Sequence, residues 1–331
     1  MTALLLDPVY QKHQPGPGHP ESPERLVALA AAFADAGVGE RTSRVAPRSA
    51  TEDEIALCHT RRYLDSVKHD FARGAHDLST GDTAIGPGSL EVALDAVGGV
   101  LNAVDEVMSG RAPNAFCAVR PPGHHATPDR GMGFCIYNNI AIAARYAQHK
   151  HHVERVLIAD WDVHHGNGTQ DIFYSDPSVF FFSTHQSPWY PGTGLAQETG
   201  AGKGRNTTLN CPFPAGAGRE LIVEAFRDKL VPAAEKFRPD LVLISAGFDS
   251  REGDPLGRFR LADPDFAELT RIMLDVANRH ARGRVVSVLE GGYSLTGIAS
   301  AATAHVEELI ALSIDTRRRS DTIWEAPVRK R

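Results

Sequence analysis

The chain has 331 residues, of which 42% are hydrophobic and 23% are charged, and its formal net charge is −6. This composition is typical of a globular protein with enough residues for a sizeable core. Proteins that bind nucleic acids nonspecifically are usually basic, so the acidic balance argues against DNA or RNA as the main partner.

The N-terminus contains one short apolar run, Ala3–Leu6, which ends at Asp7 and Pro8. The run lacks the basic start and the longer apolar region of a signal peptide, so we interpret it as a first strand. No stretch of the sequence approaches the roughly 20 apolar residues of a membrane span. We therefore expect no membrane partner.

The four cysteines are far apart in the sequence and form no C-x-x-C pair; they are Cys58, Cys117, Cys135 and Cys211. This spacing argues against a disulfide framework and against a cysteine-rich zinc site. We predict reduced thiols in the interior and a cytoplasmic location.

Apolar runs without alternation indicate strands covered on both faces, and apolar residues spaced near 3.6 indicate helices. In chain order we predict a helix over Leu90–Met108, a strand over Asn114–Val119, a helix over Asn138–Gln148, strands over Arg155–Asp160 and Ser178–Ser183, a helix over Arg219–Phe237, a strand over Asp240–Ser245, a helix over Asp263–His280, a strand over Arg284–Leu289 and a helix over Thr296–Leu312. Strands that alternate with helices predict an α/β fold with a parallel sheet.

The loops between these elements are rich in glycine and proline, and most of them follow the carboxyl end of a predicted strand, where open α/β sheets place their sites. No internal repeat or low-complexity linker divides the chain. We predict one domain over residues 1–314 and a polar, frayed C-terminal tail over residues 315–331.

The segment 160–168 carries the strongest chemical signal. Asp160, Asp162 and His164 are spaced by two residues, which in extended backbone places their side chains on one face. They stand where a buried strand ends, and buried carboxylates are costly unless they are paired or bind a metal. Carboxylate and imidazole ligands suit Zn²⁺, with Fe²⁺ and Mn²⁺ as alternatives. The other interpretation is a solvated loop in which these polar residues have the spacing by chance.

Three further segments follow predicted strands. His124 and His125 can act as acid and base, unless they are a chance surface pair. Asp249 can complete an open metal site, although alone it would sooner be read as a turn or capping residue. Tyr293 follows two glycines and can donate to an oxyanion, although alone it would be read as an ordinary rim tyrosine. The joint occurrence of four such segments favours a catalytic site.

Together these segments resemble the histone deacetylase family, which includes acetylpolyamine amidohydrolases and bacterial deacetylase-like amidohydrolases. The resemblance covers roughly residues 13–312 and keeps the family's order. The matching pieces are HPESPERL (19–26), RPPGHHA (120–126), GFCIYNNIA (133–141), DWDVHHGNGTQ (160–170), SAGFD (245–249), GDPLG (253–257) and LEGGY (289–293). Asn167 resembles the class II branch, since class I members more often have Asp there.

The resemblance implies an arginase–deacetylase fold with a central parallel sheet flanked by helices on both faces. It also implies one zinc ion per chain and a set of site residues. These are Asp162, His164 and Asp249 as zinc ligands, His124 and His125 as the tandem histidines, Asp160 and Asn167 as their respective partners, and Tyr293 as the catalytic tyrosine.

The resemblance further implies a substrate tunnel lined by Gly133, Phe134, Tyr190 and Leu256, with Asp82 at its rim. It implies two structural potassium sites. The first would use Asp160, Asp162, His164, Ser183 and Thr184; the second would use Phe173, Asp176, Val179 and Thr207.

The function implied is hydrolysis of the acetyl-amide of acetyl-lysine, in a protein or peptide, by metal-activated water. His125, with its Asn partner, is expected to be the less basic histidine and the general base, and His124 the cationic one. An acetylpolyamine or another small acylated amine is the alternative substrate, and an inactive binding protein is a further alternative. The oligomeric state stays open, and a homo-oligomer is compatible with the sequence.

Overall fold

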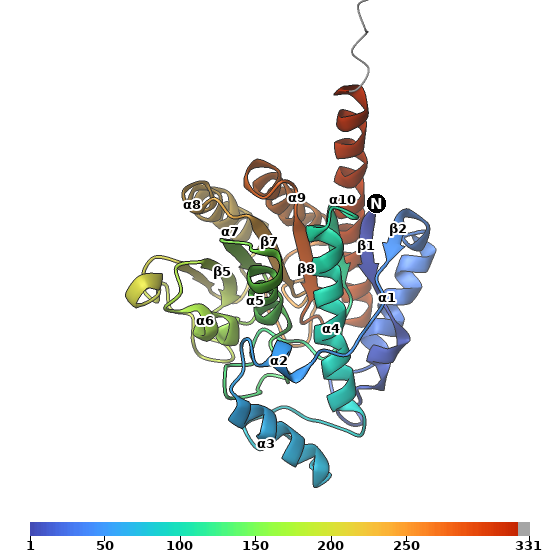
Figure 1. Cartoon of the computed structure of the whole chain (residues 1–331), viewed down its shortest axis with the longest axis vertical. Helices are drawn as coiled ribbons and strands as arrows, with labels where there is room; N and C mark the ends of the chain where they lie inside the picture. The colour runs from blue at the N-terminus through green and yellow to red at the C-terminus, as the bar shows by residue number, and fades with distance from the viewer. Residues whose placement is uncertain (324–331) are drawn as a thin grey trace, which may run out of the picture.

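The structure is a computed structural model of the whole chain, which describes the backbone of residues 1–323 and the side chains of residues 1–311 (Figure 1). The strands are β1 Thr2–Leu5, β2 Thr42–Arg44, β3 Asn114–Cys117, β4 Val156–Asp160, β5 Val179–Gln186, β6 Thr208–Phe213, β7 Leu241–Ala246 and β8 Val285–Leu289. They form one sheet in the order β2-β1-β3-β8-β7-β4-β5-β6, and every neighbouring pair is parallel.

Every strand predicted from an apolar run is present, because Val, Leu, Ile, Phe and Ala fill both faces of the central strands. All residues of β3, β4, β7 and β8 are buried. The sequence did not predict β2 and β6, the two edge strands. The residues of β2 are all polar, whereas β6 mixes polar with apolar residues and contains Pro212, which an edge strand tolerates.

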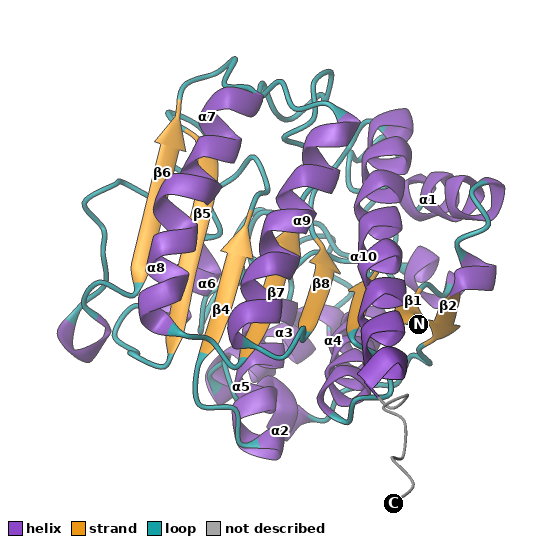
Figure 2. Ribbon diagram, turned by 90° about the horizontal axis from the view of Figure 1, so that it is seen from above, coloured by secondary structure: helices purple, strands orange, loops and turns teal. Residues whose placement is uncertain are grey.

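Helices cover both faces of the sheet (Figure 2). They are α1 Glu24–Asp35, α2 Glu52–Ile55, α3 Arg61–Ala72, α4 Ser89–Met108, α5 Asn139–His151, α6 Asn167–Phe173, α7 Arg219–Glu224, α8 Val231–Phe237, α9 Asp263–His280 and α10 Leu295–Ile323. On one face α9 packs against α10 and α1 against α10; on the other, α4 packs against α5. This arrangement confirms the predicted α/β fold, although the sequence did not predict α1, α2, α3 and α6.

The helix predicted over Arg219–Phe237 is divided. A π-helical turn, Ala225–Leu230, separates α7 from α8, and Pro232 stands at the start of α8. Proline has no backbone N–H to donate to the preceding turn, so a regular α-helical ladder cannot run through this position. π turns are rare and occur mostly as single turns within α-helices, which is the form found here.

The last helix is longer than predicted. Instead of ending at Leu312, α10 continues to Ile323. No glycine or proline stands between these two residues, so the sequence lacks a strong stop signal there. Residues 315–323 of the predicted tail are therefore helical, and residues 324–331 lie outside the described part of the chain. The division into one domain and a tail stays a prediction.

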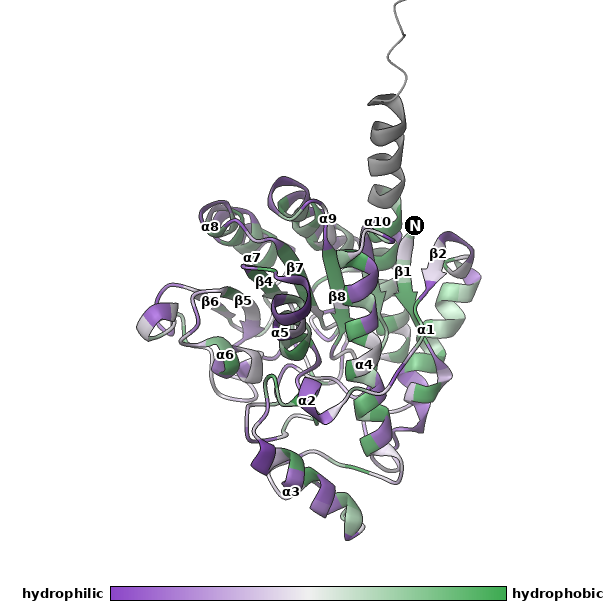
Figure 3. Cartoon of the chain, in the orientation of Figure 1, coloured by the Kyte–Doolittle hydropathy of each residue, from purple (hydrophilic) through white to green (hydrophobic). Residues whose placement is uncertain are grey.

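Hydrophobic residues concentrate along the strands and on the helix faces that meet them (Figure 3). All four cysteines are free and buried in this interior. Among the described residues, no helix is both long and apolar enough to cross a membrane. Because the sheet is parallel, the carboxyl ends of its strands open onto one edge, and the polar segments that follow β3, β8, β7 and β4 emerge next to one another.

Candidate active site

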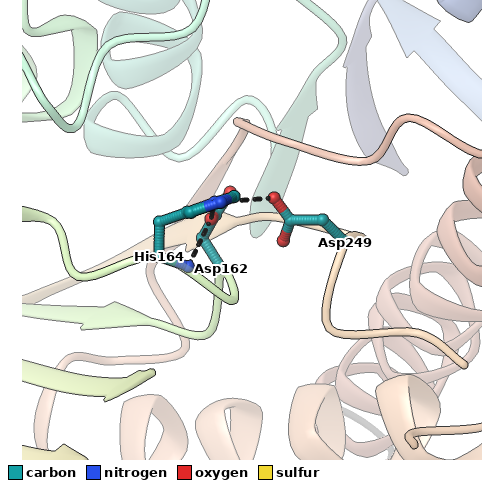
Figure 4. A group of neighbouring side chains, drawn as sticks. All are labelled: Asp162, His164 and Asp249. Atoms are coloured by element: carbon teal, nitrogen blue, oxygen red, sulfur yellow. Dashed lines mark hydrogen bonds and ion pairs between the residues drawn. The ribbon is translucent and has the colours of Figure 1, made fainter. Parts of the chain in front are cut away.

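The best-defined group at this edge consists of Asp162, His164 and Asp249 (Figure 4). The two aspartates and the histidine each offer one ligand atom, and these atoms lie within 4.8 Å of one another. Asp162 and His164 follow β4, and Asp249 follows β7, its neighbour in the sheet. All three residues are buried. They are the one such group of His, Cys, Asp or Glu among residues 1–311.

Backbone amides fix the two carboxylates. Gly291 N donates to Asp162 Oδ2 at 2.8 Å, and Val163 N donates to Asp249 Oδ1 at 2.8 Å. The loop that carries Gly291 must approach very closely, because a Cβ at this position would lie 2.0 Å from Asp249 Oδ2. Glycine is therefore required here by space. The close approach holds both aspartates in one orientation.

The electrostatics of the group favour a bound cation. Burial raises the pKa of Asp249 to about 7, and the neighbouring carboxylate of Asp162 adds to the rise. Burial opposes a charged imidazole, but hydrogen bonding and attraction to both carboxylates raise the pKa of His164 to about 10. Asp249 Oδ2 is buried and has no hydrogen-bond partner within the described residues, although it lies at ion-pair distance, 3.2 Å, from His164 Nδ1. Two buried carboxylates, one of them with this oxygen, and one imidazole fit a zinc site.

Two histidines stand beside this group in different environments. His124 Nδ1 donates to Asp160 Oδ2 at 2.9 Å, and His125 Nδ1 lies 2.8 Å from Asn167 Oδ1, to which it donates. Their rings are 4.0 Å apart. Burial opposes a charged His124, but Asp160 and Asp162 outweigh it and raise its pKa to about 10. Burial and then the charge of His124 lower the pKa of His125 well below its usual value. Near neutral pH the pair is one cation and one neutral base.

Tyr293 is placed by its backbone. Its N–H donates to Asp254 Oδ2 at 2.7 Å, and Ser294 N donates to the same oxygen at 3.0 Å. Arg25 donates to Gly292 O at 2.6 Å, and its guanidinium lies 5.0 Å from the centre of the Tyr293 ring. Desolvation raises the pKa of the Tyr293 hydroxyl well above its ordinary value, so this hydroxyl stays a hydrogen-bond donor.

A cavity of about 290 Å³ opens onto these groups. It is lined by Asp82, His125, Gly133, Phe134, His164, Trp189, Tyr190, Leu256 and Tyr293. The structure thus brings together the residues predicted for the tunnel and its rim with one metal-group residue, one tandem histidine and the tyrosine.

A sequence model described as the histone deacetylase domain matches residues 19–309. The chain belongs to the histone deacetylase family. A histone deacetylase-like amidohydrolase of Pseudomonas aeruginosa is 40% identical over 293 residues, which is 88% of this chain and 77% of the relative. The human polyamine deacetylase HDAC10 is 38% identical over 301 residues, 88% of this chain and 44% of the relative. The crystal structure of the HDA15 HD domain is 38% identical, covers 94% of this chain and 89% of its own, and superposes with a TM-score of 0.88.

These similarities confirm the predicted arginase–deacetylase fold and make this member of the histone deacetylase family a hydrolase of the deacetylase and amidohydrolase type. The individual roles predicted for the site residues stay predictions, although the geometry brings the residues together.

The two groups predicted to bind potassium also lie close together. For the first, β4 pairs with β5 so that Asp160 stands opposite Ser183. For the second, Asp176 N donates to Phe173 O at 2.9 Å, and Thr207 Oγ1 donates to Asp176 O at 3.3 Å. Potassium binding at both positions remains a prediction.

Glu290 is a site residue to which the sequence assigned no role. Its Oε2 accepts from Gly123 N at 2.7 Å and from His124 N at 3.2 Å, and its Oε1 accepts from Ser245 Oγ at 3.0 Å. Burial raises its pKa to about 7. Glu290 therefore ties the backbone of the tandem histidines to β7 and β8. A carboxylate directly after the buried run of β8 was the signal for it, because burying such a group requires partners.

A second cluster without an assigned role, formed by Glu21, Arg25 and Arg120, also contacts the segments that carry the tandem histidines and Glu290. Glu21 binds Arg120 through Nε at 2.5 Å and Arg25 through Nη1 at 2.9 Å. Arg25 also donates to Glu290 O at 2.6 Å. All of these side chains are fully buried. The charged residues Glu21 and Arg25 lie in the family motif HPESPERL, which was the sequence signal for this cluster. The sequence did not show their partners Arg120 and Glu290, because these residues are far away in the chain.

Proposed function

We propose that this protein is a zinc-dependent deacetylase that hydrolyses the acetyl-amide of acetyl-lysine in proteins or peptides. One observation carries the proposal: a single cavity is lined by His164 of the metal group, by the neutral base His125 and by the protonated hydroxyl of Tyr293. Hydrolysis of an amide needs these three capacities next to one another, namely activation of the carbonyl, a proton acceptor and an oxyanion donor.

Asp162, His164 and Asp249 would hold the zinc ion, which supplies a Lewis acid for the acetyl carbonyl and lowers the pKa of water. His125 takes the proton from the attacking water at Nε2, because its Nδ1 is occupied by Asn167. It then returns the proton to the leaving amine. The cationic His124 stabilises negative charge from its position beside the base, and Tyr293 donates to the developing oxyanion.

The cavity also supports the substrate class. Phe134 and Tyr190 provide aromatic walls for the methylene stem of acetyl-lysine, and Phe134 is held at a positive φ of 68° beside Gly133. Asp82 Oδ1 already accepts from Gly133 N at 2.8 Å, which anchors the rim to the tunnel. Leu256 completes the apolar lining.

An acetylated polyamine is the second candidate substrate, and the polyamine deacetylase among the relatives favours it. The same residues would perform the chemistry. Within the described chain, however, Asp82 is the one carboxylate among the residues that line the cavity, and Leu256 offers no charge to a second ammonium group. The cavity therefore supports a peptide more than a polycation.

The four buried free thiols support a cytoplasmic location, which we include in the proposal together with structural potassium. The acidic net charge supports a substrate or partner other than nucleic acid.

The first experiment measures zinc content and compares rates on an acetyl-lysine peptide and on N-acetylated polyamines, with wild type and Tyr293→Phe. We expect stoichiometric zinc in both proteins, a dominant peptide rate, and a roughly 10²- to 10³-fold lower kcat for the variant, the loss typical of one oxyanion donor. A dominant polyamine rate would move the assignment to the second candidate. Equal turnover by the variant would refute the role of Tyr293, and zinc binding without turnover of either substrate would refute the proposed activity.

A further inference from the structure

The mouth of the cavity carries an arginine that the proposed chemistry does not use. Arg258 is exposed, and its guanidinium lies 5.3 Å from the centre of the Trp189 ring. Trp189 lines the cavity and donates from Nε1 to Leu256 O at 2.8 Å, so its indole is a fixed platform. Among the side chains of residues 1–311, Arg258 has no ion-pair partner. Its charge is held at the rim by stacking and stays available.

A second arginine stands on the loop that leads to Gly133. Arg130 is exposed, and its Nε lies 3.4 Å from where a Cβ on Gly81 would be, directly beside Asp82. Burial and Asp82 raise the pKa of the Tyr190 hydroxyl, and the charge of Arg130 opposes this rise, so Arg130 is near the tunnel wall. Arg130 also forms no ion pair with the described side chains.

The carboxylates around the mouth do not neutralise these charges. Asp82 accepts from Gly133 N through Oδ1 and keeps its charge, but within residues 1–311 it forms no ion pair with either arginine. Asp129 accepts from Thr127 Oγ1 at 3.2 Å. Burial raises the pKa of Asp171, which is on α6, and the charge of Asp129 helps to raise it, so Asp129 lies near α6. Glu198 accepts from Gln170 Nε2 at 2.7 Å and from Gly194 N at 3.3 Å. Two guanidinium groups without ion-pair partners among the described side chains therefore stand near a cavity whose lining contains one carboxylate, Asp82.

We propose that the rim of this site selects acetyl-lysine in acidic surroundings, with Arg258 and Arg130 binding Asp or Glu residues that flank the acetylated lysine. The inference rests on the proposed function and names its substrate class more closely. A guanidinium binds a carboxylate through two parallel hydrogen bonds, whereas it repels the free ammonium groups of a polyamine. The same two arginines thus favour one candidate substrate and disfavour the other.

The expected effect of each arginine is modest because both are solvent-exposed. Exposed ion pairs correspond to roughly a two- to five-fold change in kcat/KM each. The preference should weaken as salt is added, because exposed charges are screened.

The test uses the zinc-loaded full chain and three acetyl-lysine peptides that differ only in their flanking residues, which are Asp, Gln or Lys, together with N-acetylspermidine. Arg258→Gln and Arg130→Gln are the variants. Arg260→Gln is the matched control, because Arg260 is an exposed arginine on the same loop whose backbone pairs with Gly218, away from the mouth. We expect the order Asp, Gln, Lys in kcat/KM, a reduced spread in each rim variant, and an unchanged spread with unchanged turnover of the Gln peptide in the control.

Two results would overturn the inference alone: equal rates on the three peptides, or a preference for Asp that both rim variants retain. Faster turnover of N-acetylspermidine than of the Asp peptide would also overturn it. Absence of turnover for the neutral Gln peptide and for every other substrate would instead refute the proposed function, and the inference with it.

Discussion

Asp254→Asn tests whether a residue outside the cavity sets the position of the catalytic tyrosine. The carboxylate of Asp254 accepts from Tyr293 N and Ser294 N through Oδ2, and from Leu256 N at 2.9 Å through Oδ1. An asparagine has one acceptor oxygen, so one side of the bridge would present an NH₂ group to a backbone N–H. The substitution therefore releases either the tyrosine or the tunnel wall, while the size of the side chain is kept.

The magnitude follows from these contacts. A hydrogen bond to a charged group contributes about 1.5–3 kcal/mol, and a buried donor left without a partner costs about 1–3 kcal/mol. If about 2 kcal/mol of this cost falls on the transition state, kcat decreases by roughly 30-fold. Zinc content should not change, since Asp254 is not one of the three metal-group residues.

The assay is steady-state kinetics on an acetyl-lysine peptide, with zinc content and thermal unfolding measured in parallel. Asp263→Asn is the control, because Asp263 forms a half-exposed ion pair with Arg251 and should affect kcat little. A double-mutant cycle with Tyr293→Phe decides the mechanism: if Asp254 acts through Tyr293, the second substitution adds little to the first. Fully additive losses in kcat would refute the reasoning, and so would an unchanged kcat in Asp254→Asn.

Three other substitutions test separate parts of the structure. Asn167→Asp places a carboxylate beside His125 and should raise the pKa of His125 by about 1–3. The acid limb of the pH profile of kcat/KM, where the neutral base is lost, should therefore move to higher pH. An unmoved acid limb would contradict the role of His125. Gly291→Ala drives a Cβ into Asp249 and should lower zinc affinity, measured by competition with a chelator; normal affinity would contradict the crowding. Burial lowers the pKa of His305 from 6.5 to about 3, so below about pH 6.5 the unfolded chain binds a proton that the folded chain does not. The free energy of unfolding therefore decreases as the pH drops, by about 2 kcal/mol at pH 5. His305→Gln should remove this part of the pH dependence of unfolding.

The central sheet could be predicted from the sequence because its strands are buried on both faces. A run such as Leu241–Ala246 has no polar residue except Ser245, and that pattern leaves few alternatives. The edge strands could not be predicted in this way, since no residue of β2 and only three of the six residues of β6 are buried. The break in the helix around Ala225–Leu230 could not be predicted either, because a π turn has no sequence signal beyond the nearby Pro232.

The grouping of the metal group with the tandem histidines could be predicted because each segment follows a buried strand, and the carboxyl ends of these parallel strands meet at one edge of the sheet. Trp189 and Asp254, to which the sequence assigned no role, are held by loops. Trp189 reaches the cavity only through the conformation of the segment that follows β5, and Asp254 meets Tyr293 across two separate loops. Their placement depends on contacts between residues far apart in the chain, which local patterns do not contain.

The order in which the chain supplies its site has a consequence for synthesis. The tandem histidines follow β3 and two metal-group residues follow β4, but Asp249 and Tyr293 come only with β7 and β8, and β8 inserts between β3 and β7. Domains of this size are made from the N-terminus at a limited rate, and contacts between distant segments form late. A nascent chain in which β8 is still inside the ribosome therefore lacks both the strand between β3 and β7 and the tyrosine that follows it. The site is therefore complete only after β8 and the loop that carries Tyr293 have been made.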